Sequence, residues 1–516
     1  MQRTSSNNKR IAKNAIYLYV RTMVVMLVSL YISRLVLELL GETDLGIYNV
    51  VGGIVTLMAF LQSAQAKATS RFITYELGRN GNLASLSRTF SVCMTIHITA
   101  SLVILFIAET VGVYVVNYLT SIPPERIESA NWVYQFSVLT FIVHFIRVPY
   151  DSVIIAHEDM SVYAYMSIIE VVLQLLMVYL LMRTGGDSLV RYALFLMVIA
   201  VILLFCYRMY VRRAHQVYKF HWTWDKEDSK KILSFSSWTL LGGTSNTATQ
   251  QGVSLLFNNY VGLVANTALG FANQVNTALG RFVSSFTTAF NPQIIKLYAE
   301  RNYNAMFTLM NRASKFSFTL CYIMALPLII NMDFLLRLWL VSVPEYTVEF
   351  CQLIVACTVI DSTTSVFNTA ITATGLVRKY QIGISLSFLL DLVCAWLLLI
   401  LGVHPALVFC SRIFTRGGVN MLIGFYYSYR QLKFNMRCYL REVLLPLLLT
   451  LCLTIPTGLF FNSVTNGWLR LLLTSSACML ITSLCFYIII MNKIERKRVV
   501  MFVRNKFTNG RDKIAL

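Results

Sequence analysis

The sequence predicts an all-α, polytopic membrane protein with about fourteen transmembrane helices. Of its 516 residues, 57% are hydrophobic, and the mean hydropathy is +0.63, which is more apolar surface than a soluble domain can bury. The apolar residues gather into stretches of the roughly 20 residues that span a bilayer. The lysines and arginines between these stretches are divided unequally between alternate loops. The connections leave no room for a large soluble domain.

The apolar stretches define the expected elements. In chain order they are 14–40, 46–65, 89–116, 132–156, 160–182, 188–210, 232–257, 260–290, 313–341, 346–374, 380–402, 404–428, 442–462 and 467–492. The seventh and eighth are the least typical of membrane spans, because they are rich in Ser, Thr, Asn and Gln.

The basic residues orient these spans. If the N-terminus is cytoplasmic, the loops of that side and the two termini hold 33 of the 44 Lys and Arg residues, and the opposite loops hold four. This positive-inside pattern predicts a multi-pass protein with both termini in the cytoplasm. The net charge of +20 therefore reflects topology, and we expect no nucleic-acid partner. The basic tail at 493–516 is expected to lie against anionic membrane lipids.

The chain contains a weak internal repeat. Residues 43–51 read TDLGIYNVV and residues 267–275 read TALGFANQV, with both stretches opening the second span of a six-span half. We therefore expect an N-terminal lobe at 1–210, a cytoplasmic linker at 211–231, a C-terminal lobe at 232–430 and two extra helices at 431–492. Lobes repeated in this way have the same orientation, and substrate sites lie near the interface of such repeats.

Arginines inside the apolar spans are the main functional signal. A guanidinium at the centre of a bilayer costs about 2.5 kcal/mol or more, and its planar fork suits a phosphate or a carboxylate. When the four residues at either end of each predicted span are set aside, seven arginines and no lysine lie in the spans: Arg21, Arg34, Arg147, Arg281, Arg337, Arg412 and Arg416.

Two of these arginines have an acidic partner one helical turn away. Arg34 precedes Glu38, and Arg337 follows Asp333, so each is predicted to form an i,i+4 ion pair near a helix end. Arg416 could instead extend toward the cytoplasmic surface. The other four are predicted to form an anion site: Arg21, Arg147, Arg281 and Arg412.

Two of the four leave a structural alternative open. Arg147 has Asp151 four residues on, so it could be paired rather than functional. Arg412 shares a helix face with Arg416, and the two repel each other unless an anion lies between them.

Uncharged polar residues are dense in the seventh, eighth and tenth spans. Hydrogen bonds between helices would satisfy some of them, but their density favours a water-filled cavity for a sugar or another polar solute. Gln250 and Asn273 are the predicted cavity residues. Asp361 is the candidate for a coupling proton or sodium ion, and a pairing with a basic residue of another helix is an equally open reading.

The sequence offers no catalytic or metal-binding constellation. The eleven cysteines are scattered and form no CxxC or His/Cys cluster, so we expect no disulfide framework, metal or cofactor. No Ser/His, His/Asp or phosphate-loop arrangement appears, and Glu42 and Asp44 lie in a loop too short for an active site. We therefore expect a transporter rather than an enzyme.

Several short motifs resemble the polysaccharide-exporter branch of the multidrug/oligosaccharidyl-lipid/polysaccharide flippase superfamily, above all the bacterial flippases for lipid-linked oligosaccharide repeat units. The resemblance covers essentially the whole chain. Its motifs are the basic start at 8–14, Ser33-Arg34, Leu40-Gly41, the acidic-x-Gly-x-Tyr turn within 42–48, Asn291-Pro292-Gln293, Leu338-Trp339-Leu340, Pro344-Glu345-Tyr346 and Ala373-Thr374-Gly375.

The resemblance implies two pseudo-symmetric six-helix lobes around a central cavity in the bacterial inner membrane. It implies alternating access for undecaprenyl-diphosphate-linked sugars, with polymerase or assembly proteins as possible partners. In such proteins, cavity arginines on the first and eighth helices hold the diphosphate, and Arg21 and Arg281 lie on comparable spans. The alternatives are a cation-coupled drug antiporter of the same superfamily and a membrane-embedded glycosyltransferase or polymerase.

Overall fold

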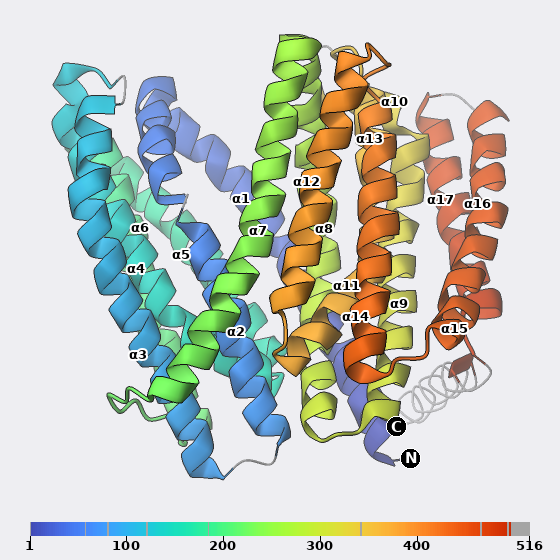
Figure 1. Cartoon of the computed structure of the whole chain (residues 1–516). Helices are drawn as coiled ribbons and strands as arrows, with labels where there is room; N and C mark the ends of the chain where they lie inside the picture. The colour runs from blue at the N-terminus through green and yellow to red at the C-terminus, as the bar shows by residue number, and fades with distance from the viewer. Residues whose placement is uncertain are drawn as a thin grey trace, which may run out of the picture. The chain divides into compact units, whose positions relative to one another are not determined.

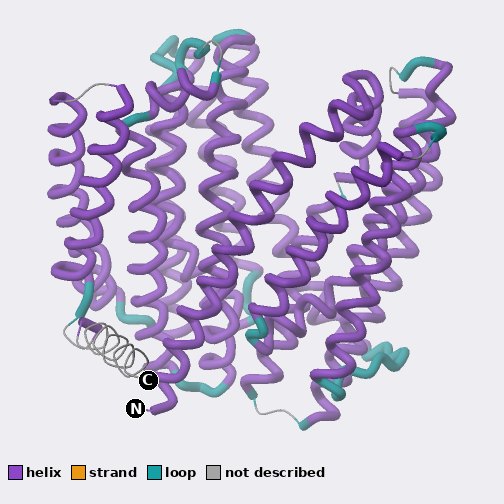
Figure 2. Tube along the Cα trace, turned by 180° about the vertical axis from the view of Figure 1, so that it is seen from behind, coloured by secondary structure: helices purple, strands orange, loops and turns teal. Residues whose placement is uncertain are grey.

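The computed structural model describes residues 2–56, 58–79, 82–119, 122–183, 185–340, 343–464, 467–492 and 495–496. The described residues are almost entirely helical and contain no strand (Figures 1 and 2). The all-α fold class is therefore confirmed. The basic tail that was expected to contact lipid headgroups lies almost wholly outside the described residues.

The helices of the first half follow one another through short connections (Figure 1). They are α1 (Gln2–Thr56), α2 (Ala59–Gly78), α3 (Leu83–Ile107), α4 (Ile127–His157), α5 (Met160–Arg183) and α6 (Ser188–Ala214). Gly41 breaks α1 with φ 73° and ψ 174°, a backbone conformation that glycine adopts at little steric cost. The chain therefore enters its second span at the position predicted from the sequence.

The second half repeats this order. Its helices are α7 (Lys226–Tyr260), α8 (Leu263–Ala299), α9 (Tyr303–Ile330), α10 (Met332–Trp339), α11 (Thr347–Thr374), α12 (Arg378–Ile400), α13 (Leu407–Arg412) and α14 (Asn420–Leu432). Gly262, with φ 109°, separates α7 from α8 as Gly41 divides α1. The extra helices α15 (Met436–Tyr439), α16 (Leu445–Val464) and α17 (Gly467–Cys485) follow.

Ten helices of the described chain are long and apolar enough to cross a membrane. The second, seventh, eighth and twelfth expected spans are also helical, but they contain too many polar residues to be counted among these ten. Helix α2 shows why, because it buries Gln65, Thr69, Arg71 and Thr74. A helix that packs its polar side chains against protein gives only a weak hydropathy signal. About fourteen helical spans therefore agree with the prediction.

Some predicted boundaries were wrong. The region 66–88 was expected to be a basic loop, but α2 continues to Gly78 and carries Arg71. Likewise, α9 begins at Tyr303 and carries Lys315, which is buried. The expectation that no lysine lies inside the spans is therefore wrong, because α9 starts ten residues before the predicted span and Lys315 is in its interior.

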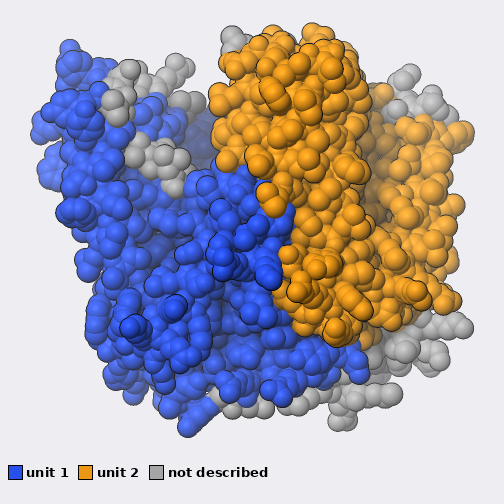
Figure 3. Space-filling view, in the orientation of Figure 1, with its two compact units in different colours: residues 1–247, 284–306, 369–385 blue, residues 248–283, 307–368, 386–516 orange. Residues whose placement is uncertain are grey.

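The described residues form two compact units (Figure 3). Unit 1 comprises 1–247, 284–306 and 369–385, and unit 2 comprises 248–283, 307–368 and 386–516. In unit 1, α4 packs on α2 and α6, and α1 packs on α5, around large buried side chains such as Tyr134, Phe145 and Tyr207. The units divide helices, so the expected lobes stay a prediction.

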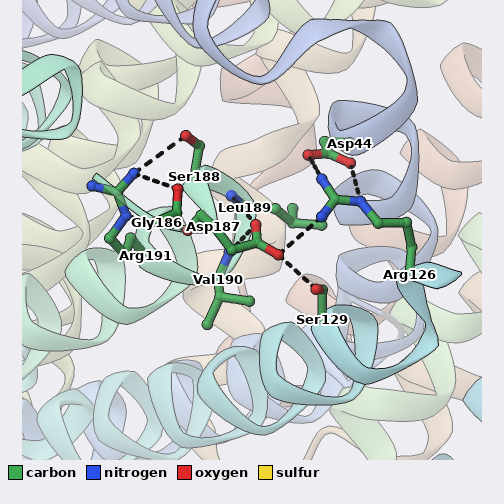
Figure 4. Close-up of polar contacts among 9 residues, drawn as sticks. All are labelled: Asp44, Arg126, Ser129, Gly186, Asp187, Ser188, Leu189, Val190 and Arg191. Atoms are coloured by element: carbon green, nitrogen blue, oxygen red, sulfur yellow. Dashed lines mark hydrogen bonds and ion pairs between the residues drawn. The ribbon is translucent and has the colours of Figure 1, made fainter. Parts of the chain in front are cut away.

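One end of unit 1 is held by a polar cluster (Figure 4). Asp187 caps α6 by accepting a hydrogen bond from the Leu189 amide at 2.9 Å. It also accepts from Arg126 Nη1 at 3.0 Å and from the Ser129 hydroxyl at 2.6 Å. Arg126 Nε donates to Asp44 at 3.0 Å. Asp44 is therefore a structural partner here, as its short loop suggested.

Candidate functional site

Arg147 on α4 is the centre of a charged cluster in unit 1. Its side chain is 13% exposed, with Nε 3.5 Å from Asp151 and Nη1 3.7 Å from Glu170. The guanidinium also lies over the Tyr207 ring, 5.0 Å from the centroid. At these ion-pair distances Nε and Nη1 make no hydrogen bond within the described chain. The two carboxylates therefore balance the charge of Arg147, but its Nε and Nη1 hydrogen-bond donors have no acceptor among the described residues.

Arg21 on α1 joins the same cluster. Its guanidinium lies 4.9 Å from the centroid of the Tyr163 ring on α5, and its Nε is buried without a hydrogen-bond partner among the described residues. Asp151 and Tyr163 each lie within electrostatic range of both Arg21 and Arg147. The fold therefore brings together two predicted anion-site residues that are far apart in the sequence.

A cavity of about 580 Å³ lies within unit 1 and reaches His144, one turn before Arg147 on α4. Its lining combines uncharged polar and aromatic residues with small and aliphatic ones, so it offers hydrogen-bonding groups and apolar surface to a sugar ring. The lining includes Tyr48, Asn49, Gln62, Ser137, Thr140 and Phe141. The sequence analysis did not predict these residues as cavity lining, although Tyr48 and Asn49 lie in its repeat, because the polar ones are few within otherwise apolar helices.

Arg412 lies in a second charged cluster, in unit 2. Its Nε is 3.7 Å from Asp391 of α12, and Arg416 Nε is 3.6 Å from the same carboxylate. The Thr415 hydroxyl donates to the other oxygen of Asp391 at 3.1 Å. The anion that the sequence required between Arg412 and Arg416 is thus supplied by the chain. The alternative for Arg416, extension toward the surface, is wrong, because its side chain is 11% exposed and faces Asp391.

Asp361, the predicted coupling-ion residue, lies on α11 in unit 2. It is within electrostatic range of Arg416 and Arg412. Its carboxylate therefore belongs to the same charged neighbourhood as Asp391, and both readings given by the sequence, ion coupling and pairing with a base, remain predictions.

The other predicted site residues are also in unit 2. Arg281 is exposed on α8, Asn273 is half-buried on α8, and Gln250 is half-buried on α7. Some polar residues near them connect helices. The Ser254 hydroxyl donates to Asn266 at 2.7 Å, which is a bond between α7 and α8. Hydrogen bonding between helices thus accounts for part of the polar density.

The two pairs at helix ends are confirmed. Arg34 Nε lies 3.0 Å from Glu38, and Arg337 Nε lies 2.9 Å from Asp333, all four side chains being at least half exposed. Within the described residues, no group of three or more His, Cys, Asp or Glu side chains is placed to hold a metal ion.

Solved structures of MATE transporters share the fold. One MATE mutant structure superposes with a TM-score of 0.72 at 12% identity, covering 82% of this chain and 96% of that one. A Vibrio cholerae MATE transporter mutant gives a TM-score of 0.70 at 14% identity, covering 84% and 100%. An outward-facing multidrug resistance MATE transporter of the MOP superfamily gives 0.71 at 13% identity, covering 83% and 96%.

No curated protein sequence matches the chain significantly. The sequence profile of the polysaccharide biosynthesis protein family, by contrast, matches residues 11–298, more than half of the chain, and agrees with the resemblance drawn from the motifs. The protein therefore belongs to the polysaccharide biosynthesis protein family and is a multi-pass membrane protein with the MOP-superfamily fold.

Proposed function

We propose that the protein translocates undecaprenyl-diphosphate-linked oligosaccharide repeat units across the bacterial inner membrane by alternating access. Both termini would lie in the cytoplasm, and the flipped units would serve the assembly of O-antigen, capsule or another surface polysaccharide. The observation that carries the proposal is the Arg21–Arg147 cluster, one helical turn along α4 from a cavity of about 580 Å³ that contains His144.

The cluster has the chemistry to hold a diphosphate. A buried arginine fork binds phosphate oxygens through paired, charge-assisted hydrogen bonds. Arg147 faces its carboxylates at 3.5 and 3.7 Å, too far for strong hydrogen bonds. The Nε and Nη1 donors of Arg147 are unengaged but buried, so a diphosphate would bind them in a step of the transport cycle that opens the cluster.

The cavity supplies a place for the sugar. Hydroxyl, amide and imidazole groups of Ser137, Thr140, Asn49 and His144 line it together with aromatic rings. Such groups can exchange hydrogen bonds with many sugar hydroxyls without demanding one stereochemistry. Arg281, Arg412, Gln250 and Asn273 remain predicted contributors, and Asp361 the predicted coupling-ion residue.

Deleting the gene in its native host tests the proposal. Lipid-linked repeat units should accumulate on the cytoplasmic leaflet, and the surface glycan should disappear. Complementation with the wild-type gene should restore it, and complementation with Arg147→Gln should not. Unchanged surface glycan in the deletion strain would contradict the proposal.

A cation-coupled antiporter is the second candidate, and one observation favours it. Both clusters are balanced, with Arg21 and Arg147 near Asp151 and Glu170 in unit 1. Unit 2 likewise places two aspartates near two arginines. Carboxylates of this kind could bind a cation or a proton. Export of a cationic dye in exchange for protons, measured in proteoliposomes, would distinguish this function.

A further inference from the structure

Arg71 on α2 is buried in unit 1 without an ion pair among the described residues, although the carboxylate of Glu76 lies within electrostatic range. Arg71 is 8% exposed, and its Nη2 donates a hydrogen bond to the Ala373 carbonyl at 2.9 Å. Its Nε makes no hydrogen bond among the described residues. The guanidinium lies near two aromatic rings, 4.5 Å from the centroid of Phe72 and 4.8 Å from that of Tyr75. A guanidinium has five donors, so this one is under-used.

The turn between α11 and α12 is shaped around this guanidinium. Gly375 adopts φ +78°, and a Cβ there would come within 2.8 Å of Arg71 Nη2. Only glycine satisfies both demands without strain. The Ala373-Thr374-Gly375 motif therefore has a local role, because it provides one hydrogen bond to Arg71 and lets the guanidinium approach the turn closely.

Two cavities of unit 1 adjoin at Arg71. One of about 550 Å³ and another of about 560 Å³ share Arg71, Phe72 and Lys231. Together their linings contain six cationic and three acidic side chains. Neither has a lining residue in common with the cavity of about 580 Å³ beside His144. The positive charge therefore forms a separate site.

Part of this charge is balanced internally, and part is not. Arg88 pairs with Asp225 and lies 3.7 Å from Asp228, and Lys231 pairs with Glu227 at 2.8 Å. Arg71, Arg79 and Lys230 have no ion pair within the described chain. An anion in the cavities would meet these remaining charges.

The apolar part of the lining indicates what carries the anion. Leu376 and Phe235 line the smaller cavity with Trp238, on which the Arg378 guanidinium stacks at 4.9 Å. Leu376 is 70% exposed. Arg378 is the first residue of α12, and tryptophan and arginine side by side are typical of the lipid headgroup region. An apolar rim beside buried donors suits a phosphate that is attached to a lipid.

We propose that the two cavities around Arg71 form a lipid-phosphate site, distinct from the transport cluster, that binds the phosphate-bearing headgroup of a membrane lipid. The ligand is either a bilayer phospholipid such as phosphatidylglycerol or the polyprenyl diphosphate carrier. Arg71 is the central donor, and Lys230 and Arg378 supply surrounding charge.

Lipid titration of the purified full chain, followed by native mass spectrometry, tests this site. We expect Arg71→Gln to weaken phosphatidylglycerol or undecaprenyl diphosphate binding about tenfold or more, the loss typical of a charged hydrogen bond. Arg213→Gln, the same change at an exposed arginine on the last turn of α6, should leave binding unchanged. Lys230→Gln with Arg378→Gln tests the site with Arg71 intact and should weaken binding at least threefold.

The lipid that responds identifies the ligand. An Arg71-dependent loss with phosphatidylglycerol assigns the site to bilayer lipid, and a loss with undecaprenyl diphosphate alone assigns it to the carrier. Equal affinity of wild type and both variants for each lipid would overturn the proposal. The proposal would also be overturned if phosphatidylcholine bound as tightly as phosphatidylglycerol and the binding of undecaprenyl diphosphate did not depend on Arg71. A third contradicting result would be inorganic pyrophosphate binding as tightly as either lipid. Because binding is measured without transport, failure of the flippase assay would not affect this result.

Discussion

Arg147 and Arg412 lie in helices that the sequence marks as membrane spans, and each meets carboxylates of the same chain. Arg412 was predicted to bind a substrate anion, yet Asp391 approaches it at 3.7 Å. The sequence could single out the arginines because a charge stands out in an apolar run. It could not identify Glu170 or Asp391 as partners, because each pair connects two different helices, and the spacing within one helix does not show which faces of two helices meet.

Two substitutions of Arg147 are expected to distinguish the effect of its positive charge from the effect of its planar, two-donor geometry. Arg147→Lys keeps the charge but loses the fork, so transport of the lipid-linked oligosaccharide should fall about tenfold, and Arg147→Gln should reduce it about a hundredfold. Arg34→Gln, at an exposed helix-end pair, is the control and should transport normally. Full transport by Arg147→Gln at normal expression would remove this residue from the proposed site.

Loss of Asp391 is expected to destabilise the protein strongly. Asp391→Asn leaves Arg412 and Arg416 buried without their shared carboxylate, and breaking a buried pair costs about 3–5 kcal/mol. Asp333→Asn breaks the exposed pair with Arg337 and should cost less than about 1 kcal/mol. Denaturant unfolding in detergent measures both, and equal effects would show that Asp391 contributes little to stability.

At the scale of elements, the apolar helices were predictable and the polar ones only in part. The breaks at Gly41 and Gly262 agree with the repeat found in the sequence. The full length of α2 was not predicted, since its buried face carries Gln65 and Arg71. Hydropathy measures the preference for lipid, so it fails where a helix faces protein.

The start of α6 gives a test at this scale. Burial raises the pKa of Asp187, but hydrogen bonds from Ser129 and the Leu189 amide and the charge of Arg126 lower it more, so the net shift is downward. Asp187→Ala should lower the free energy of unfolding by about 1 kcal/mol, as loss of an N-cap does. Asp187→Asn keeps the cap and should cost less.

The pH dependence of Asp187 follows from the same shift. A carboxyl group with a depressed pKa stabilises the fold above its unfolded pKa of about 3.9 and loses this contribution as pH falls through its lower folded value. The difference in unfolding free energy between wild type and Asp187→Ala should therefore be constant from about pH 5 to about pH 8. It should shrink below about pH 4. A difference that grows on acidification would contradict this assignment.

At the scale of the whole molecule, the sequence predicted the fold class, the approximate number of spans and the family. The substrate site was predictable only as residue types, because Arg21 and Arg147 are brought together by packing of α1, α4 and α5. The cavity beside His144 and the charged cavities around Arg71 depend on which faces of neighbouring helices meet. The patterns of a single sequence do not predict those contacts.

The most direct test of the proposed function is transport in proteoliposomes that contain a fluorescent undecaprenyl-diphosphate-linked oligosaccharide in the inner leaflet only. A membrane-impermeant glycosidase outside the vesicles reports the lipid that has crossed. The wild-type protein should expose the sugar to the enzyme faster than protein-free vesicles, and Arg21→Gln and Arg147→Gln should not. Wild-type vesicles that expose no sugar but exchange a cationic dye for protons would contradict the flippase function and favour the antiporter.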